Sequence, residues 1–309
     1  MRLLRAVTPE YKNRFVQGKT IVYMFLPEVE PPCNRRCTGC YVLASESYPK
    51  RIRRSEERII ADLKGLIASG YSVIPSTTEI LLGERYLEML GAVGTTYVLT
   101  NGRLIVSKPG TLEELKSIGI RQVVLTANFG NSGLILPDQD TFVEAAGLAI
   151  GAGLGVMARI TLTKGNYQSI AEMVDACKQF GIRCIQFLRF MPIESGPATL
   201  DEGDAKEFFR LLAFAREANP DVYISAGGSL GSQFRGKEFV CSAGRTQFTI
   251  GLDNRIYPCI YLTQDENAIG RYENGEVVIE REFAIGGNEL DCPAYRYFVS
   301  RSKNGEKRI

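Results

Sequence analysis

The chain has 309 residues, of which 45% are hydrophobic and 23% are charged, so it can form one large globular domain with a smaller appendage. Its 37 basic and 35 acidic residues leave a net charge of +2, which gives no electrostatic basis for nucleic acid or an anionic membrane as the main partner. The absence of histidine excludes Ser-His-Asp and Cys-His catalytic groups, and zinc sites that mix Cys with His.

The first segment, residues 1–19, lacks the apolar core of a signal peptide. No stretch of the chain approaches the roughly 20 apolar residues that a membrane helix needs. We therefore expect a soluble, cytoplasmic protein. In a reducing cytosol its eight cysteines are more readily explained as metal ligands or catalytic groups than as a disulfide framework.

From residue 20 onward, short apolar runs alternate with longer amphipathic stretches, as in repeated βα units around a parallel sheet. The predicted strands are 21–26, 72–75, 96–99, 122–126, 155–161 and 184–190. The predicted helices between them are 55–69, 83–91, 110–118, 138–152 and 166–181. Several of these helices end in Gly, as a helix C-cap favours. The pattern predicts an α/β protein with a partial (β/α)6 TIM-like barrel, two units short of a full barrel.

A sixth helix, 203–218, is followed by a Gly-rich connection over 226–236, which we take as the domain boundary. Downstream the sequence changes to short strands and turns, which indicate a small β-rich extension. The predicted domains are therefore a barrel over 20–225 and a carboxy-terminal extension over 235–309.

Three cysteines, Cys33, Cys37 and Cys40, follow the first predicted strand, at the end of a βα barrel where active sites form. A structural zinc site needs four closed ligands and a [4Fe-4S] cluster has four irons. Three close cysteines therefore lack a ligand or leave one iron open, and the absence of His favours the open iron. The alternative is a chance grouping of free cysteines.

The segment CNRRCTGCY resembles the cluster loop of the radical SAM superfamily, and it follows the first strand as the loop of that family does. The resemblance implies a [4Fe-4S] cluster on Cys33, Cys37 and Cys40 whose open iron chelates S-adenosylmethionine (SAM). It also implies reductive cleavage of SAM to a 5′-deoxyadenosyl radical, which abstracts hydrogen from a substrate. The chain departs from the family by having Gly39 where an aromatic residue usually precedes the third cysteine, with Tyr41 just after it.

The same resemblance suggests residues that bind SAM. The segment PSTTEIL resembles the Gly-Gly-Glu-Pro segment that binds the SAM amino group, so Glu79 and Thr78 are candidates, although Thr-Thr-Glu is also an ordinary helix-capping sequence. Asn128 and Arg159, near the ends of the fourth and fifth strands, are candidates for the SAM ribose and carboxylate. A structural salt bridge is the alternative role for Arg159. Tyr41 is expected over the cluster or near adenine, or else in the core.

Three further cysteines, Cys241, Cys259 and Cys292, lie in the predicted extension, with a hairpin between the first two. This arrangement resembles the SPASM/twitch extension of radical SAM enzymes, in which cysteines hold auxiliary [4Fe-4S] clusters. Three cysteines allow at most one such cluster, and they leave its fourth ligand open, with Asp291 adjacent to Cys292. A small domain with a small hydrophobic core often depends on a bound metal for its stability, and this favours a metal site in the extension.

The alternative for this second group is that Cys241 or Cys259 is a free thiol that donates a hydrogen atom to a substrate radical. The two remaining cysteines have a different expected role. Cys177, in a predicted amphipathic helix, and Cys184, at the start of a predicted strand, are expected to be buried core thiols.

The leading hypothesis is a radical SAM oxidoreductase or epimerase acting on a small molecule or a peptide in natural-product biosynthesis. Related alternatives are a peptide-modifying enzyme of ribosomal natural products or an enzyme like the sulfatase maturases. The short segment before the first strand favours a small molecule or a separate peptide partner. The resemblance also implies a flavodoxin- or ferredoxin-type reductant. An iron-sulfur electron carrier is the non-enzymatic alternative.

Overall fold

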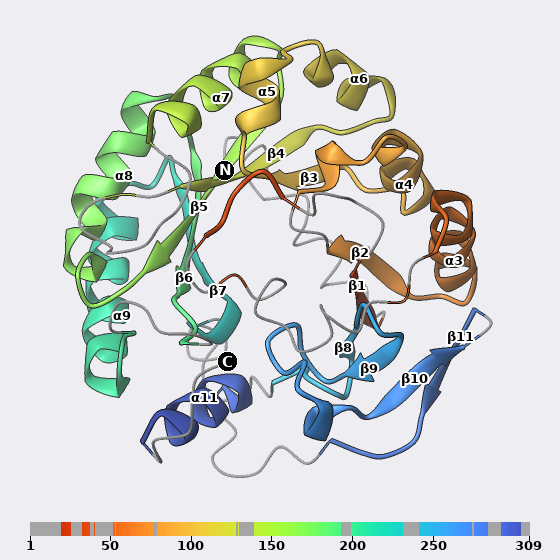
Figure 1. The fold of residues 1–309 in the computed structure, drawn as a ribbon. Coiled ribbons are helices and arrows are strands. Elements are labelled where there is room, and N and C mark those ends of the chain that lie inside the picture. The colour runs from red at the N-terminus through yellow and green to blue at the C-terminus, as the bar shows by residue number, and fades with distance from the viewer. Residues whose placement is uncertain are drawn as a thin grey trace.

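The computed structural model describes residues 20–25, 33–37, 40, 52, 54–76, 79–127, 129, 139–192, 199–230, 241–273, 275–283 and 292–303. Its parallel barrel strands form an arc, with helices along the outer side (Figure 1). These strands are β1 (Ile21–Phe25), β2 (Ser72–Ser76), β3 (Tyr97–Thr100), β4 (Gln122–Ala127), β5 (Gly155–Leu162), β6 (Cys184–Arg189) and β7 (Tyr223–Gly227).

The covering helices are set by local capping signals. Ser55 caps the first of them by accepting a hydrogen bond from the Arg58 N–H, and Asp201 and Asp204 form a reciprocal capping box on the last. These helices are α3 (Glu56–Ala68), α4 (Tyr86–Ala92), α5 (Arg103–Ser107), α6 (Thr111–Ser117), α7 (Gln139–Gly151), α8 (Ile170–Gln179) and α9 (Glu202–Ala218). Short 3-10 turns are η1 (Ile80–Leu82), η2 (Tyr167–Ser169), η3 (Gly228–Leu230) and η4 (Asp265–Asn267).

The carboxy-terminal strands continue the barrel sheet instead of forming a separate one. Strand β8 (Gln247–Ile250) pairs in parallel with β1, with Ile21 opposite Gln247. Antiparallel pairing then adds β9 (Arg255–Tyr257), β10 (Gly270–Glu273) and β11 (Glu276–Ile279), giving the order β11-β10-β9-β8-β1-β2. The other sheet has the order β3-β4-β5-β6-β7. Helix α11 (Pro293–Lys303) follows the last of these strands.

This architecture confirms the predicted α/β class, with a partial barrel and a β-rich carboxy-terminal region. All six predicted strands are present, and β7 adds a seventh that the sequence analysis did not predict. Strand β7 crosses residue 225, so the first residues of the predicted Gly-rich connection, Ala226 and Gly227, belong to a strand. The division into a domain over 20–225 and one over 235–309 stays a prediction.

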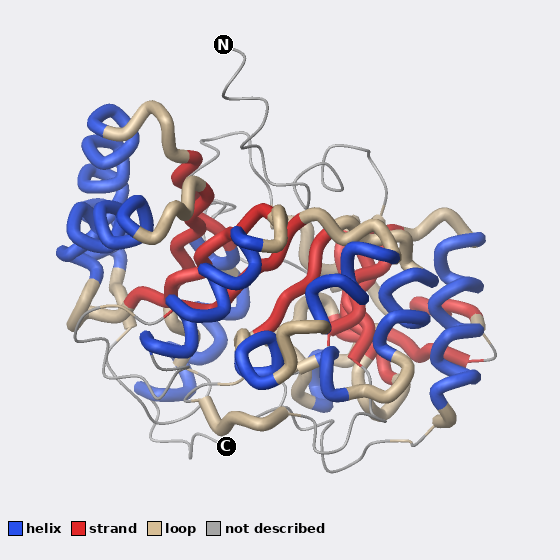
Figure 2. The backbone as a smooth tube through the Cα atoms, turned by 90° about the horizontal axis from the view of Figure 1, so that it is seen from above, coloured by secondary structure: helices blue, strands red, loops and turns tan. Residues whose placement is uncertain are grey.

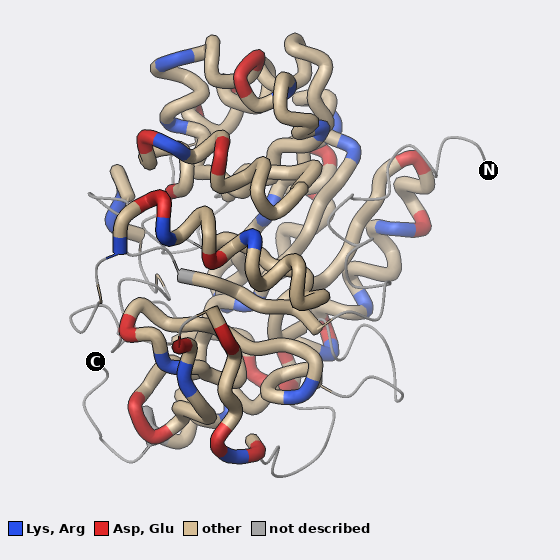
Figure 3. Tube along the Cα trace, turned by 90° about the vertical axis from the view of Figure 1, so that its right-hand side faces the viewer, with Lys and Arg blue, Asp and Glu red and all other residues tan. Residues whose placement is uncertain are grey.

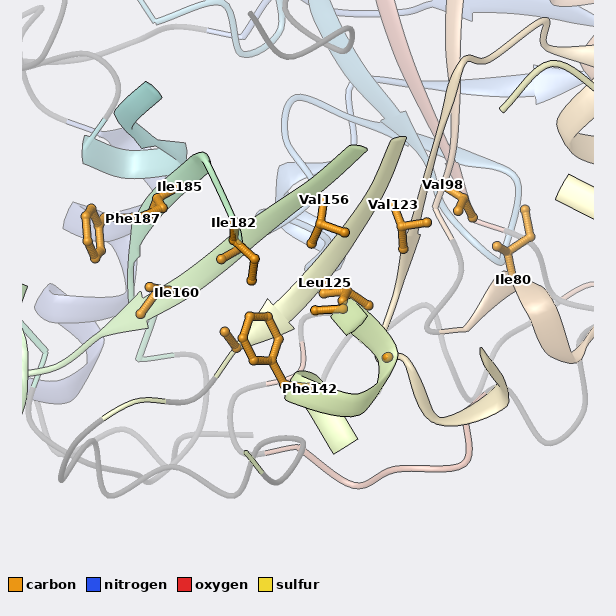
Figure 4. Close-up of a cluster of buried hydrophobic side chains, with 14 of the residues drawn as sticks. Ile80, Val98, Val123, Leu125, Phe142, Val156, Ile160, Ile182, Ile185 and Phe187 are labelled. Carbon is orange, nitrogen blue, oxygen red and sulfur yellow. The ribbon is translucent and has the colours of Figure 1, made fainter. Parts of the chain in front are cut away.

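Side chains along each strand point alternately to the two faces of the sheet, and this separates two groups of apolar residues. Outward-facing residues such as Val123 and Leu125 pack under the helices, together with Phe142 of α7 (Figure 4). The residue between them, Val124, belongs to a smaller group on the other face of the sheet with Met157. This inner group also includes Tyr97 and Cys184. Cys177 packs in the outer group, so both cysteines expected in the core are buried.

Seen from above, the strands run through the middle of the molecule, with helices to the left and right of them (Figure 2). Basic and acidic positions are interspersed along the trace in the view of Figure 3. Among the described residues, no helix has the length and apolar character needed to span a bilayer.

Candidate functional site

Glu79 lies just after β2 and is completely buried. Its Oε2 atom accepts hydrogen bonds from the Thr100 hydroxyl (3.0 Å) and the Asn101 N–H (2.8 Å). Its Oε1 atom accepts a longer one from the Leu81 N–H (3.4 Å). Burial raises the pKa of this carboxyl to about 7, although the three donors act in the opposite direction. Glu79 therefore joins the carboxyl ends of β2 and β3.

Asn101, the residue after β3, connects this edge to the cysteine loop. Its Nδ2 atom donates to the Asn34 side-chain oxygen (2.8 Å) and lies 3.6 Å from the Cys33 sulfur. Its own oxygen accepts from the Arg103 N–H (3.0 Å), and the Arg103 guanidinium donates to the Asn34 carbonyl (3.1 Å). The start of the loop is therefore held against the end of β3 by side chains from outside the loop.

The thiols of Cys33, Cys37 and Cys40 lie close enough to affect one another electrostatically. The pKa of the Cys37 thiol is raised to about 11, mainly by burial and also by the charges of Cys40 and Cys33. Burial also raises the pKa of Cys33, and Glu79 and Cys40 act in the same direction. Binding of a cationic metal-containing group would offset the free-energy cost of ionising these buried thiols, because coordination displaces the thiol protons. The three thiols therefore fit a metal-containing group.

Among the described residues, no group of three or more Cys, Asp or Glu side chains is arranged to hold a single metal ion. A [4Fe-4S] cluster takes its thiolates on different irons, so its ligands surround a group and do not converge on one ion. Cys33, Cys37 and Cys40 supply the three thiolates that such a cluster takes when one iron is left open.

Polar side chains on neighbouring strands, β4 to β7, form a row across the inner face of the barrel. This row lies beside the apolar group that contains Met157. Arg159 of β5 lies opposite Thr126 on β4 and Gln186 on β6, and Gln186 lies opposite Ser225 on β7. The Arg159 Nε atom donates to the Gln186 side-chain oxygen (3.2 Å). This row provides hydrogen-bonding groups inside the barrel, where a polar ligand can be bound.

Gly227, at the end of β7, leaves room for that row. A Cβ atom at this position would lie 2.6 Å from the Gln186 Nε2 atom and 3.1 Å from a Leu188 methyl carbon. The absence of a side chain at Gly227 therefore permits the observed position of the Gln186 amide, which in turn accepts from Arg159.

The second cysteine group is also brought together. The pKa of the Cys259 thiol is raised to about 12, mainly by burial and also by the charges of Cys292 and Cys241. Cys259 and Cys292 pack at the edge of a small apolar cluster that contains Leu262 and Phe298. The three thiols come from the segment before β8, the segment after β9 and the segment before α11. They too fit a group that binds several thiolates.

Some of the residues predicted to bind SAM or a cluster are described by the structure and others are not. Glu79 lies after β2, and Arg159 lies on β5 inside the barrel. The residues outside the described part of the chain are Tyr41, Thr78, Asn128 and Asp291. Asn34, Asn101, Arg103 and Gln186 were not selected from the sequence. Asn101 was recognisable as a polar residue that follows a strand, but its contact with Cys33 depends on a fold that brings positions 68 residues apart together.

Comparison with protein-family models finds no match, and comparison with curated proteins finds none either. Solved structures do match. The Streptococcus suis protein SuiB bound to its precursor peptide SuiA is 17% identical with a TM-score of 0.61, and the match covers 92% of this chain and 68% of SuiB. SuiB bound to S-adenosylmethionine is 19% identical with a TM-score of 0.58, over 81% of this chain and 62% of SuiB.

The protein anSMEcpe, in a structure with bound AdoMet and the Cp18Cys peptide, gives a match of almost the whole length of both chains. It is 16% identical with a TM-score of 0.59, and the match covers 93% of this chain and 97% of anSMEcpe. At these identities the comparisons establish the fold. The predicted resemblance is confirmed at that level: over most of its length the chain has the fold of the radical SAM SPASM proteins SuiB and anSMEcpe.

Proposed function

We propose that the protein is a radical SAM enzyme that acts on a peptide or a small molecule. The observation that carries this proposal is the placement of Cys33, Cys37 and Cys40 after β1, held by Asn101 against the end of β3, in a fold shared with AdoMet-bound proteins. When bound there, a [4Fe-4S] cluster supplies the electron that cleaves SAM to methionine and a 5′-deoxyadenosyl radical, which takes a hydrogen atom from the substrate.

The residues of the chain have separate tasks in this proposal. Cys33, Cys37 and Cys40 hold the cluster, and Asn101 orients Cys33. Glu79 fixes the strand ends, and since a carboxylate has about four acceptor positions, its three hydrogen bonds leave capacity for the SAM ammonium group.

Inside the barrel, Arg159 is assigned to an anionic group of SAM or substrate, with its Nε atom held by Gln186. The proposed contacts of Thr78, Asn128 and Tyr41 with SAM follow from the sequence resemblance alone. A flavodoxin- or ferredoxin-type protein is proposed as the electron donor.

The second group, Cys241, Cys259 and Cys292, is proposed to hold one auxiliary [4Fe-4S] cluster. The mutual electrostatic effect of these thiols supports this assignment. Asp291 is the proposed fourth ligand. An auxiliary cluster permits net oxidation of the substrate, because it can accept the second electron from the substrate radical.

A peptide substrate is supported by the structures with the same fold, since SuiB is bound to a precursor peptide and anSMEcpe to a peptide. Epimerisation is the second candidate reaction, and it requires a hydrogen-atom donor such as an unligated Cys259 or Cys241. Turnover in deuterated water separates the two reactions. Solvent deuterium at the reacting carbon indicates epimerisation, whereas a product oxidised by two electrons without deuterium indicates dehydrogenation.

Calorimetric titration of the reconstituted protein with SAM tests the proposal. We expect saturable binding that is lost in the variant in which Cys33, Cys37 and Cys40 are all alanine. An iron-sulfur electron carrier would contain iron but would not bind SAM, so iron incorporation without SAM binding would contradict the enzymatic assignment.

A further inference from the structure

Arg189, the last residue of β6, is a cation buried inside the protein, with only 5% of its surface exposed. Its Nε atom donates to the Ser229 hydroxyl (3.0 Å) in η3. Burial of a guanidinium group is costly unless its charge interacts with negative or polarisable groups.

The flat face of the guanidinium packs against an aromatic ring from the carboxy-terminal helix. Its central carbon lies 3.5 Å from the centre of the Tyr295 ring, a stacking geometry that suits arginine. The Tyr295 hydroxyl in turn donates to the Leu200 carbonyl (2.9 Å). Arg189 and Tyr295 therefore join the end of β6 to the first turn of α11, three residues after Cys292.

Arg189 lies beside the second cysteine group. The Tyr295 ring on which it stacks packs against the same small apolar cluster as Cys259 and Cys292. Three thiolates in a buried site repel one another, and a fixed cation beside one of them offsets part of that repulsion.

We propose that Arg189 is a charge-balancing residue of the second cysteine site. Its guanidinium stabilises the thiolate-bound cluster that the proposed function places on Cys241, Cys259 and Cys292. Because a reduced cluster carries one more negative charge than an oxidised one, the same cation also raises the reduction potential of that cluster. Arg189 acts through the ligand Cys292 and the stacked Tyr295, so it is a positioning residue.

The experiment uses protein in which Cys33, Cys37 and Cys40 are replaced by alanine, so that iron reports the second site alone. Two substitutions separate charge from shape. R189K keeps the positive charge and loses the planar group, whereas R189Q is neutral and retains a planar amide that can hydrogen-bond to Ser229. R183M is the matched control, because Arg183 precedes the same strand and its side chain is 44% exposed.

Iron per chain and the midpoint potential of the cluster, followed by electron paramagnetic resonance, are the readouts. For R189Q we expect about a tenfold weaker affinity of the cluster for the electron, which corresponds to a midpoint potential about 59 mV more negative. Loss of iron from folded R189Q, with iron retained in R189K, also supports the proposal. R189K and R183M are expected to stay close to the parent protein.

An unchanged potential in iron-loaded R189Q would overturn the proposal, and so would equal loss of iron from R189K and R189Q, since shape and not charge would then decide. If R189Q does not fold, the midpoint potential of R189K tests the proposal. A role for charge requires that this potential stay close to that of the parent protein, and a clearly shifted potential would contradict it. If the parent variant contains no iron, there is no second cluster and the proposed role of Arg189 is wrong. The enzymatic proposal is tested separately, by SAM cleavage in the wild type.

Discussion

The side-chain amide nitrogen of Asn101 lies 3.6 Å from the sulfur of Cys33, although the two residues are 68 positions apart. The same amide donates to Asn34, the residue after Cys33. Asn101 follows β3 directly, and its backbone N–H is held by the buried Glu79. The end of β3 therefore positions the first cysteine of the loop.

The first prediction concerns this contact. N101A removes an N–H donor to the Cys33 sulfur and the bond to Asn34, and loss of such an outer partner typically weakens metal binding by about 10- to 100-fold. We expect less iron per chain and an altered paramagnetic spectrum of the reduced cluster. S107A, on the exposed face of α5, is the control and is expected to match the wild type. An iron content and spectrum unchanged in N101A would contradict the positioning role.

The second prediction uses the buried carboxyl of Glu79, whose pKa is raised from 4.5 to about 7. Since the folded state binds this proton more tightly than the unfolded state, the group contributes stability at low pH that is lost as pH rises from about 4.5 through about 7. The pKa of the neighbouring Cys33 thiol is itself raised, so this thiol stays neutral in that range.

Thermal unfolding of iron-free wild type and E79Q between pH 5 and pH 8 measures this effect. The melting temperature of the wild type should decline with pH relative to that of E79Q, which has no carboxyl to titrate at this position. E144Q, on the exposed surface of α7, controls for the loss of a carboxylate. Parallel curves for wild type and E79Q would show that burial does not raise this pKa in solution.

The third prediction concerns the space beside Gln186. In G227A the new methyl group would lie within 3 Å of the Gln186 amide, and such overpacking typically costs about 1–3 kcal/mol. Displacement of Gln186 also removes the acceptor of Arg159, so SAM affinity should fall together with stability.

The control for this substitution is G147A in α7, where nothing lies within 4 Å of the added carbon. It should stabilise the protein by about 0.5–1 kcal/mol, because alanine favours a helix. Urea unfolding and SAM titration of both variants check the pair. A G227A protein with wild-type SAM affinity would argue against a role of the Arg159–Gln186 pair in binding.

The fourth prediction concerns metal removal. The apolar cluster of Met191, Leu262, Ala294 and Phe298 is small, so a cluster on the adjacent cysteines should contribute much of the local stability. Chelation of iron should speed amide hydrogen exchange in α11 and in the segment after β9 more than in β4 and β5. Equal effects across these elements would contradict a metal site in the carboxy-terminal region.

Much of the barrel was predictable because its signals are local. Apolar runs of strand length alternate with capped amphipathic helices, and the six predicted strands are all present. Strand β7 was missed because its sequence, YISAG, is short and ends in the small residues that also mark a loop. The pairing of β8 with β1 was not predicted either, since it joins residues more than 200 positions apart.

The site was predictable only in part for the same reason. The cysteine spacing is a local pattern, so it was visible in the sequence. The contacts of Glu79 with Thr100 and Asn101, and that of Arg189 with Tyr295, exist only after strand ends and α11 come together. No nearby residue in the sequence marks these partners.

The central claim is that Cys33, Cys37 and Cys40 support reductive cleavage of SAM. The most direct test is anaerobic incubation of the reconstituted protein with SAM and dithionite, with 5′-deoxyadenosine measured by chromatography. The wild type should form 5′-deoxyadenosine, the triple alanine variant of these cysteines should form none, and the triple alanine variant of Cys241, Cys259 and Cys292 should retain cleavage. Iron-loaded wild type that forms no 5′-deoxyadenosine, or equal formation in the Cys33, Cys37 and Cys40 variant, would contradict the claim.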